Sequence, residues 1–246
     1  MSEYKYGIVV PTCAEPSILM DSVPRFFNFA EEDTIVIFSF NPKSKEKALQ
    51  TEEIIKFFYN QLRTRNVDYD IVWSEDAIGF GSAVNKGTRH LEWNYGLPDY
   101  IIIANDDLEV TQGWMKGLSD TFKSKLFTTR SLMILNKDDK EKASMDISNL
   151  NSKIGMVGPL SNGVFNEQAL PYENTQHIKK VGIDLYADRH KKGNKDVYLK
   201  TMFLSGYCFM ISKECFLDMK DSNFEYKGIF DTRFKIGGYE DDDLCV

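Results

Sequence analysis

The chain has 246 residues, 42% hydrophobic and 27% charged, which is typical of a globular protein with one large domain. It carries 30 Lys and Arg residues against 37 Asp and Glu residues, and this net charge of −7 argues against general nucleic-acid binding. Its four scattered cysteines indicate neither a zinc site nor a disulfide framework, so we expect reduced thiols in a cytoplasm. No apolar run approaches the ~20 residues of a transmembrane segment, so any membrane association is expected to be peripheral.

The first 110 residues alternate between two kinds of pattern. Short apolar or alternating runs rich in β-branched residues predict strands at 7–11, 34–38, 67–73 and 100–104. Apolar residues at helical spacing between these runs predict helices at 17–29, 45–63 and 81–93. This alternation predicts an α/β fold with a mostly parallel, doubly wound, Rossmann-like sheet and helices on both of its faces.

The pattern is looser in the rest of the chain. We expect a helix at 112–126, strands at 154–158 and 202–211, and a short helix at 212–219. The second of these strands is interrupted by Gly206. Segment 161–200 is rich in Asn, Gly, Lys and His, and a long excursion of this kind within a compact domain is more often a functional loop than a structureless one.

The strand expected at 100–104 ends in Asn105, Asp106 and Asp107. Magnesium and similar ions take oxygen ligands, and a site with one or two carboxylates leaves positions open for phosphate oxygens. The same three residues are also good turn and helix-cap formers. On these residues alone, a solvated turn is the preferred interpretation.

Polar residues also follow the other expected strands, where ligands bind in open α/β sheets. These segments are 11–15, 39–41 and 74–76. Residues 79–82, Gly-Phe-Gly-Ser, begin the third expected helix, where backbone N–H groups can face a phosphate. They form neither a Walker loop nor a complete dinucleotide fingerprint, so the glycines alone are weak evidence.

A second acidic cluster occupies residues 240–243, close to the end of the chain. Four consecutive acids form either a disordered acidic tail or a site that uses them. Gly238 and Tyr239 before the cluster and Leu244 after it favour a folded turn that enters a helix. Neighbouring acids raise one another's pKa, which suits a general base acting on a hydroxyl.

Taken in order, these segments resemble the family 2 glycosyltransferases of the GT-A fold, particularly the rhamnosyltransferase-like branch. The resemblance rests on six segments spread along the chain: 8–12, 79–87, 99–110, 155–159, 205–210 and 230–245. It implies a single GT-A catalytic domain over 1–246, with a nucleotide-sugar-binding half at 1–110 and an acceptor-binding half at 111–246. Because the chain stops three residues after Asp243 within an expected helix, we also expect either a minimal catalytic domain or one shortened at its C-terminus.

The resemblance implies an inverting transfer of a sugar from a nucleoside-diphosphate sugar to the hydroxyl of a glycan or another acceptor, assisted by Mn²⁺ or Mg²⁺. The family's D-x-D motif stands here with asparagine in its first place, which leaves Asp107 as the metal ligand and assigns Asn105 and Asp106 to the ribose or diphosphate. The other implied contacts are Pro11, Thr12, Glu15, Asn41 and Asn85 for the nucleotide, and Ser205, Gly206 and Tyr207 for the acceptor. Asp241 is implied as the general base, and Glu240 as its partner or an acceptor contact.

Two other functions remain open at this point. A sugar nucleotidyltransferase also uses an α/β sheet with acids around a metal, but it normally needs a basic, glycine-rich loop after the first strand. Residues 11–15 contain neither glycine nor Lys or Arg, which counts against it. A non-catalytic nucleotide-sugar or glycan-binding module is the other alternative, and the intact pair Glu240 and Asp241 argues against it.

Overall fold

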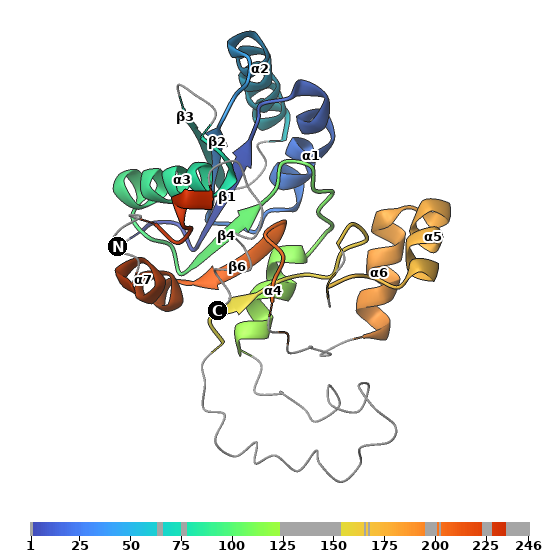
Figure 1. Cartoon of the computed structure of the whole chain (residues 1–246). Helices are drawn as coiled ribbons and strands as arrows, with labels where there is room; N and C mark the ends of the chain where they lie inside the picture. Colours follow the sequence, from blue (N-terminus) through green and yellow to red (C-terminus); the bar gives the residue numbers. More distant parts are fainter. Residues whose placement is uncertain are drawn as a thin grey trace, which may run out of the picture.

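The computed structural model describes residues 2–62, 66–74, 78–123, 154–164, 166, 168–194, 201, 203–222 and 228–234, and it places helices around a six-stranded sheet (Figure 1). The strands are β1 (Tyr6–Thr12), β2 (Thr34–Phe40), β3 (Val67–Trp73), β4 (Tyr100–Ala104), β5 (Met156–Val157) and β6 (Cys208–Ser212). The α-helices are α1 (Pro16–Phe29), α2 (Lys45–Leu62), α3 (Phe80–Tyr95), α4 (Trp114–Lys123), α5 (Tyr172–Val181), α6 (Ile183–Gly193) and α7 (Lys213–Ser222). A 3₁₀ turn follows at Thr232–Phe234.

The strand order in the sheet is β3-β2-β1-β4-β6-β5. The first four strands are parallel, with Val9 of β1 opposite Ile37 of β2 on one side and Ile103 of β4 on the other. Strand β6 runs antiparallel to both β4 and β5. The chain therefore winds outward from β1 to β3 and then crosses to β4 on the opposite side of β1. Such a switch point leaves room for a ligand at the carboxyl ends of the two strands.

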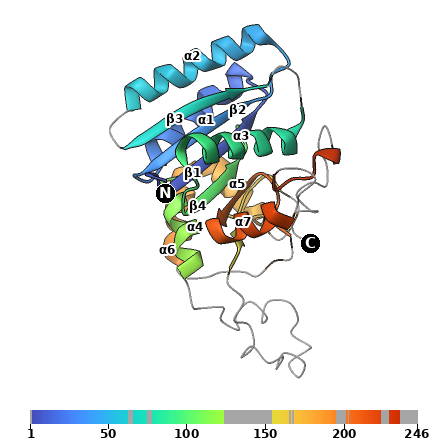
Figure 2. The same ribbon diagram turned by 90° about the vertical axis from the view of Figure 1, so that its left-hand side faces the viewer.

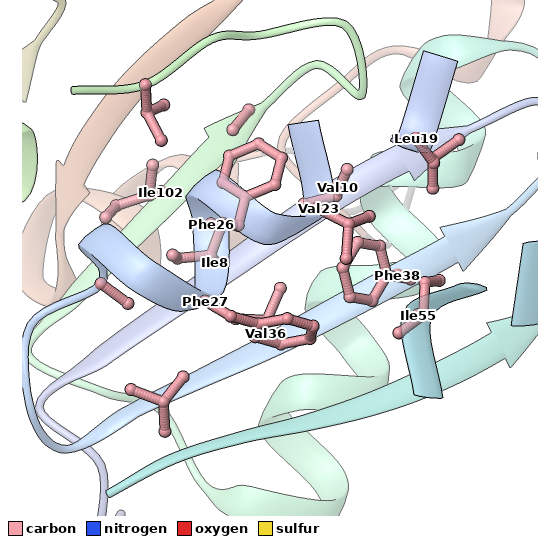
Figure 3. Close-up of a cluster of buried hydrophobic side chains, with 14 of the residues drawn as sticks. Ile8, Val10, Leu19, Val23, Phe26, Phe27, Val36, Phe38, Ile55 and Ile102 are labelled. Carbon is pink, nitrogen blue, oxygen red and sulfur yellow. The ribbon is translucent and has the colours of Figure 1, made fainter. Parts of the chain in front are cut away.

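Helices cover both faces of the sheet, as the sequence predicts. On one face, Ile8, Val10 and Phe38 pack under Phe26 of α1 and Ile55 of α2, and the exposed fraction of each of these side chains is 0% (Figure 3). On the other face, α3 and α7 cover the side chains that alternate with these along the strands. In Figure 2, α3 crosses in front of the strands and α1 lies behind them. Strands β1, β2 and β4 are buried on both faces and therefore read as nearly continuous apolar runs in the sequence.

Helix α3 approaches the sheet closely at Gly87. A Cβ atom added to Gly87 would lie 2.5 Å from Cγ1 of Val9 and 3.2 Å from Cβ of Ser39. The hydroxyl of Ser39 also donates a hydrogen bond to the carbonyl oxygen of Ala83, at 2.7 Å. The absence of a side chain at Gly87 therefore lets α3 lie directly on β1 and β2.

We expect Gly87→Ala to lower the free energy of unfolding by about 1–3 kcal/mol, because the added methyl group overpacks a rigid helix–sheet contact. Gly117 in α4 provides the matched control, since a Cβ atom there would meet nothing within 4 Å. Gly117→Ala should raise stability by roughly 0.5–1 kcal/mol through helix propensity alone. Urea denaturation of both variants measures the difference, and equal effects of the two substitutions would refute close packing at Gly87.

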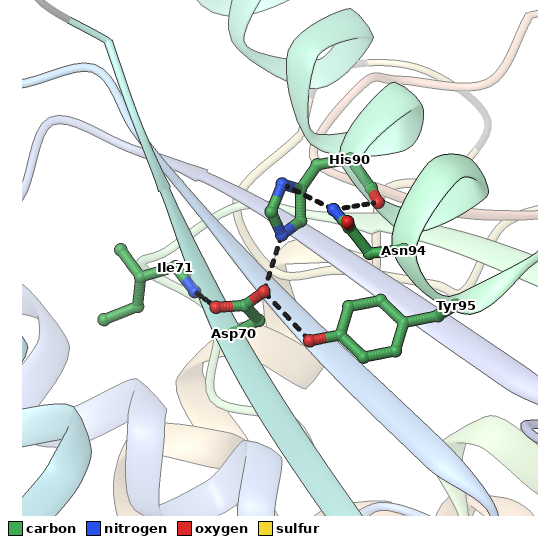
Figure 4. Close-up of polar contacts among 5 residues, drawn as sticks. All are labelled: Asp70, Ile71, His90, Asn94 and Tyr95. Carbon is green, nitrogen blue, oxygen red and sulfur yellow. Dashed lines mark hydrogen bonds and ion pairs between the residues drawn. The ribbon is translucent and has the colours of Figure 1, made fainter.

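The edge strand β3 is tied to α3 by a polar cluster in the middle of the strand (Figure 4). The carboxylate of Asp70 lies 2.6 Å from Nε2 of His90 and accepts hydrogen bonds from the hydroxyl of Tyr95 at 2.9 Å and the N–H of Ile71 at 2.7 Å. Burial raises the pKa of Asp70, but these hydrogen bonds outweigh burial and hold it below its usual value. Burial and the contact with Asp70 raise the pKa of Tyr95 to about 12. The cluster lies away from the carboxyl ends of the strands and serves to hold β3.

The fold differs from the sequence prediction mainly in the later part of the chain. Segment 161–200 contains the helices α5 and α6, which bury few apolar residues and so give a weak periodic pattern. The strand expected at 202–211 begins only at Cys208, because the N–H of Ser205 is bound by a side chain and not by a neighbouring strand. Met202 lies outside the described residues. Within the part of the chain that the structure describes, no helix has both the length and the hydropathy needed to span a membrane.

Candidate functional site

The carboxyl ends of β1 and β4 meet at the switch point of the sheet. We call residues 105–107, which follow β4, the acid turn. The hydroxyl of Thr12, the last residue of β1, donates a hydrogen bond to Oδ2 of Asp106 at 2.5 Å. The same hydroxyl accepts the backbone N–H of Ala14, at 2.9 Å. Thr12 therefore joins the loop after β1 to the acid turn.

The two carboxylates of the acid turn have different surroundings. Asp106 is largely buried, and its burial raises its pKa, as does the negative charge of Asp107. The hydrogen bond from Thr12 acts in the opposite direction but does not cancel these effects. The Asp107 residue is exposed to solvent. Asp106 is thus held in place by the protein, whereas Asp107 is accessible to a ligand.

The raised pKa of Asp106 predicts a pH-dependent effect of Asp106→Asn on stability. A carboxyl group whose pKa is higher in the folded state contributes stability below its unfolded pKa of about 3.9, and this contribution is lost as the pH rises through its folded pKa. The unfolding free energy of the variant minus that of the wild type should therefore increase as the pH rises from about 3 to about 7.

Chemical denaturation at a series of pH values measures this difference. Asp21→Asn on the exposed surface of α1 removes one carboxylate without touching the acid turn, and so controls for the change in net charge. A difference for Asp106→Asn that falls as the pH rises would contradict the prediction.

Asn105 contributes both its backbone and its side chain to the acid turn. Its N–H donates to the carbonyl oxygen of Tyr207, at 2.8 Å. Its Oδ1 atom is buried, and within the described part of the chain it has no hydrogen-bond partner. A buried, unpaired oxygen usually costs about 1–3 kcal/mol, so a ligand atom, a cation or an ordered water that pairs with it would stabilise the acid turn.

Oδ1 of Asn105 and the carboxylate of Asp107 are the kind of oxygen donors that Mg²⁺ and Mn²⁺ accept. The described residues contain no group of three or more His, Cys, Asp or Glu side chains that could hold a metal ion. A cation held by one or two protein oxygens keeps positions open for other ligands, such as the phosphate oxygens of a bound molecule.

The residues predicted to contact the nucleotide surround the ends of β1 and β2. Pro11 is buried within β1, and Glu15 forms an ion pair with Lys47, with Oε2 and Nζ 2.6 Å apart. Asn41 follows β2, where its N–H donates to the carbonyl oxygen of Thr12 at 2.8 Å and its Oδ1 accepts the N–H of Ile78 at 2.5 Å. Asn41 thereby joins three loops at this edge. The nucleotide contacts themselves stay predictions.

Asn85 lies inside α3 and has another partner. Its Nδ2 donates to the carbonyl oxygen of Phe230 at 2.7 Å, and its Oδ1 accepts the N–H of Phe230 at 3.0 Å. The exposed fraction of Asn85 is 1%, and a Cβ atom on Gly228 would overlap its amide. Asn85 thus anchors segment 228–231 to α3, and its expected contact with a ribose or diphosphate stays a prediction.

The segment predicted to border the acceptor, Ser205, Gly206 and Tyr207, lies directly beside the acid turn. Tyr207 meets Asn105 through its carbonyl oxygen, while its hydroxyl donates to the carbonyl oxygen of Pro159. Burial raises the pKa of the Tyr207 hydroxyl, so it remains a donor. The structure therefore brings the predicted acceptor segment and the acid turn together.

Gln168 is buried among these loops. The sequence does not single it out, because a lone glutamine in a polar segment gives no pattern.

Glu240 and Asp241 lie outside the described residues, so their predicted roles are untested. The last described residues, 228–234, lie at the start of α3, where the rings of Phe80 and Phe230 are 5.6 Å apart between centroids.

Comparisons with known proteins identify the fold of this chain but do not assign it to a family. No protein-family model matches the chain, and no curated protein sequence matches it. A solved structure of the mannosyltransferase PcManGT from Pyrobaculum calidifontis, in complex with GDP-Man and Mn²⁺, is similar with a TM-score of 0.53 and 12% sequence identity. The match covers 98% of this chain and 50% of that protein, so the chain spans about half of its length.

A second solved structure, that of TarS from S. aureus, has a TM-score of 0.30 and 15% identity over 42% of this chain and 16% of that protein, a similarity too low to carry an argument. The first similarity extends over nearly the whole chain and agrees with the observed strand order and helices. The protein therefore has a GT-A type α/β fold.

Proposed function

We propose that the protein is a glycosyltransferase that moves a sugar from a nucleoside-diphosphate sugar to an acceptor hydroxyl, with inversion at the anomeric carbon. The observation that carries this proposal is the acid turn at the switch point, where Thr12 holds Asp106, Asp107 is exposed, and Oδ1 of Asn105 is buried without a partner among the described residues. The GT-A type fold, shared with a mannosyltransferase whose structure contains GDP-Man and Mn²⁺, supports it.

Each residue of the proposed site has a separate role in this reaction. Asp107 would hold a divalent cation, which when bound offsets the negative charge that develops on the leaving diphosphate. Asn105, assigned from the sequence to the ribose or diphosphate, has an Oδ1 atom without a partner among the described residues that could also serve as an oxygen ligand of this cation. Asp106, oriented by Thr12, is placed to contact the ribose or diphosphate. Asp241 accepts the proton of the acceptor hydroxyl as its oxygen bonds to the anomeric carbon. The bond from that carbon to the diphosphate breaks in the same step, and the nucleoside diphosphate leaves with the bonding electrons.

A thermal-shift screen of UDP-, GDP- and dTDP-sugars, each with Mn²⁺ or Mg²⁺, tests donor binding. A ligand at 100 times its dissociation constant should stabilise the fold by about 2.7 kcal/mol. The absence of a shift with every nucleotide would favour a function without nucleotides.

Asp107→Ala should abolish the part of donor affinity that depends on the metal, because it removes the exposed carboxylate of the acid turn. Isothermal titration of the donor with and without Mn²⁺ measures this effect. Asp188→Ala serves as the control, since Asp188 is also exposed but lies on α6 and pairs with Lys192. If Asp107→Ala retains the full metal dependence, Asp107 is not the ligand.

A further inference from the structure

Gln168 lies in the loop between β5 and α5, and its exposed fraction is 4%. Its Nε2 donates to the carbonyl oxygen of Pro159 at 2.9 Å, and its Oε1 accepts the backbone N–H of Ser205 at 2.6 Å. The side-chain amide of Asn166 makes a longer contact with the same Oε1, at 3.3 Å. Both ends of this buried amide are therefore engaged, and moving it would leave buried polar groups without their partners.

The contact between Gln168 and Ser205 continues to the acid turn. Two residues after Ser205, the carbonyl oxygen of Tyr207 accepts the N–H of Asn105, at 2.8 Å. The Tyr207 hydroxyl donates to the same Pro159 carbonyl oxygen that Gln168 binds. The backbone of segment 205–207 is thus held at one end by Gln168 and meets the acid turn at the other.

Among the described residues, the pairing of β6 with β4 does not extend to Ser205. Strand β6 begins at Cys208, opposite Ala104, and the N–H of Ser205 points to the glutamine side chain. The fit around the amide is close, because a Cβ atom on Gly158 would lie 2.5 Å from Nε2 of Gln168. The Gln168 side chain therefore holds the backbone at Ser205 through a contact that the pairing of β6 with β4 does not supply.

We infer that Gln168 is a positioning residue for the acid turn: by holding segment 205–207, it fixes the backbone of Asn105, from which Asp106 and Asp107 follow. This inference rests on the proposed function for its effect on turnover. Its effect on structure does not depend on that function. Gln168 touches neither the acid turn nor, in the proposed reaction, the substrate, so it acts only through Ser205 and Tyr207.

Gln168→Met tests the inference, because methionine keeps the approximate volume of the side chain and removes both hydrogen-bonding ends. Hydrogen–deuterium exchange of the full chain should show the amides of Ser205 and Asn105 exchanging at least about tenfold faster, with the amides of β1 and β2 unchanged. Gln176→Met on the exposed surface of α5 is the matched control, and it should leave the exchange of Ser205, Asn105, β1 and β2 unchanged.

A second experiment measures the effect of Gln168→Met on turnover. It follows the release of nucleoside diphosphate from UDP-glucose, GDP-mannose and dTDP-rhamnose with Mn²⁺ and with water as the acceptor. Because displacement of a reacting group by about 1 Å can cost about 10²-fold in rate, kcat of Gln168→Met should fall roughly 10- to 10²-fold while KM for the donor changes less. Ile55→Val, which is buried against α1 and remote from the acid turn, supplies a variant that loses stability without touching the loops.

The outcomes separate the two claims. Unchanged exchange at Asn105 in Gln168→Met would overturn the inference, and so would an equal loss of kcat in Ile55→Val at a similar loss of melting temperature. If the wild type cleaves none of the donors, the proposed function fails for them, and the exchange result at Asn105 alone decides whether Gln168 positions the acid turn.

Discussion

Asp241→Asn should reduce glycosyl transfer by about 10²- to 10⁴-fold while donor affinity stays nearly unchanged, because a positioned general base contributes about that much to the rate. Asparagine has nearly the shape of aspartate but cannot accept the proton of the acceptor hydroxyl at neutral pH. The measurement is the release of nucleoside diphosphate at saturating donor, with donor affinity determined separately by isothermal titration.

Asp242→Asn is the matched control for this substitution, since it removes the neighbouring carboxylate and changes the net charge equally. It should retain most of the activity, because the proposed mechanism gives Asp242 no proton to accept. Full turnover in Asp241→Asn would sink the assignment of the base. Loss of donor affinity in Asp241→Asn would instead move this residue to the donor side of the site.

Asn85→Ala should be the most damaging single substitution for stability in α3. It leaves the N–H and the carbonyl oxygen of Phe230 without their partners in a buried place, at a combined cost of roughly 2–6 kcal/mol. It should also lower turnover beyond the effect on stability, because segment 228–231 leads towards Glu240 and Asp241. Urea denaturation gives the first effect, and assays well below the melting temperature give the second.

Asn94→Ala tests whether the cost belongs to the contact with Phe230 and not to the helix. Asn94 is exposed on the same helix, so its replacement should change the free energy of unfolding by no more than about 0.5 kcal/mol. Asn85→Asp should cost at least as much as Asn85→Ala, because an ionised carboxylate would be buried with one of its oxygens facing the carbonyl oxygen of Phe230. A cost below about 1 kcal/mol for Asn85→Ala would show that segment 228–231 is held by other contacts.

The sequence predicts the first four strands well, because β1, β2 and β4 are buried on both faces and leave continuous apolar runs, while the edge strand β3 shows the alternation of a half-buried strand. The predicted start of the strand at 202–211 is wrong, because a backbone N–H in this segment bonds to a side chain and not to a neighbouring strand. Residues 203–207 are apolar enough for a strand, yet Gln168 binds the N–H of Ser205, and the ladder with β4 begins only at Cys208. A contact between residues 37 positions apart leaves no trace in a local pattern.

The same distinction applies to the site. The acid turn can be located from sequence because strand ends carry ligands in α/β sheets, and Thr12 and Asn105 do lie at neighbouring strand ends. The difference in burial between Asp106 and Asp107 is not readable in this way, since it depends on the loop after β1, whose Thr12 hydroxyl bonds to Asp106. The contact of Asn85 with Phe230 is likewise hidden, because it joins residues 145 positions apart.

The antiparallel pairing of β6 with β4 limits how this protein can move. Five residue pairs, from Tyr100 opposite Ser212 to Ala104 opposite Cys208, join the later part of the chain to the strand that carries the acid turn. Rotating one part against the other about a hinge would break buried backbone hydrogen bonds of this ladder. If the protein catalyses the proposed transfer, we therefore expect the motion that admits and releases ligands to lie in the loops beyond the strand ends, with the sheet as a rigid frame.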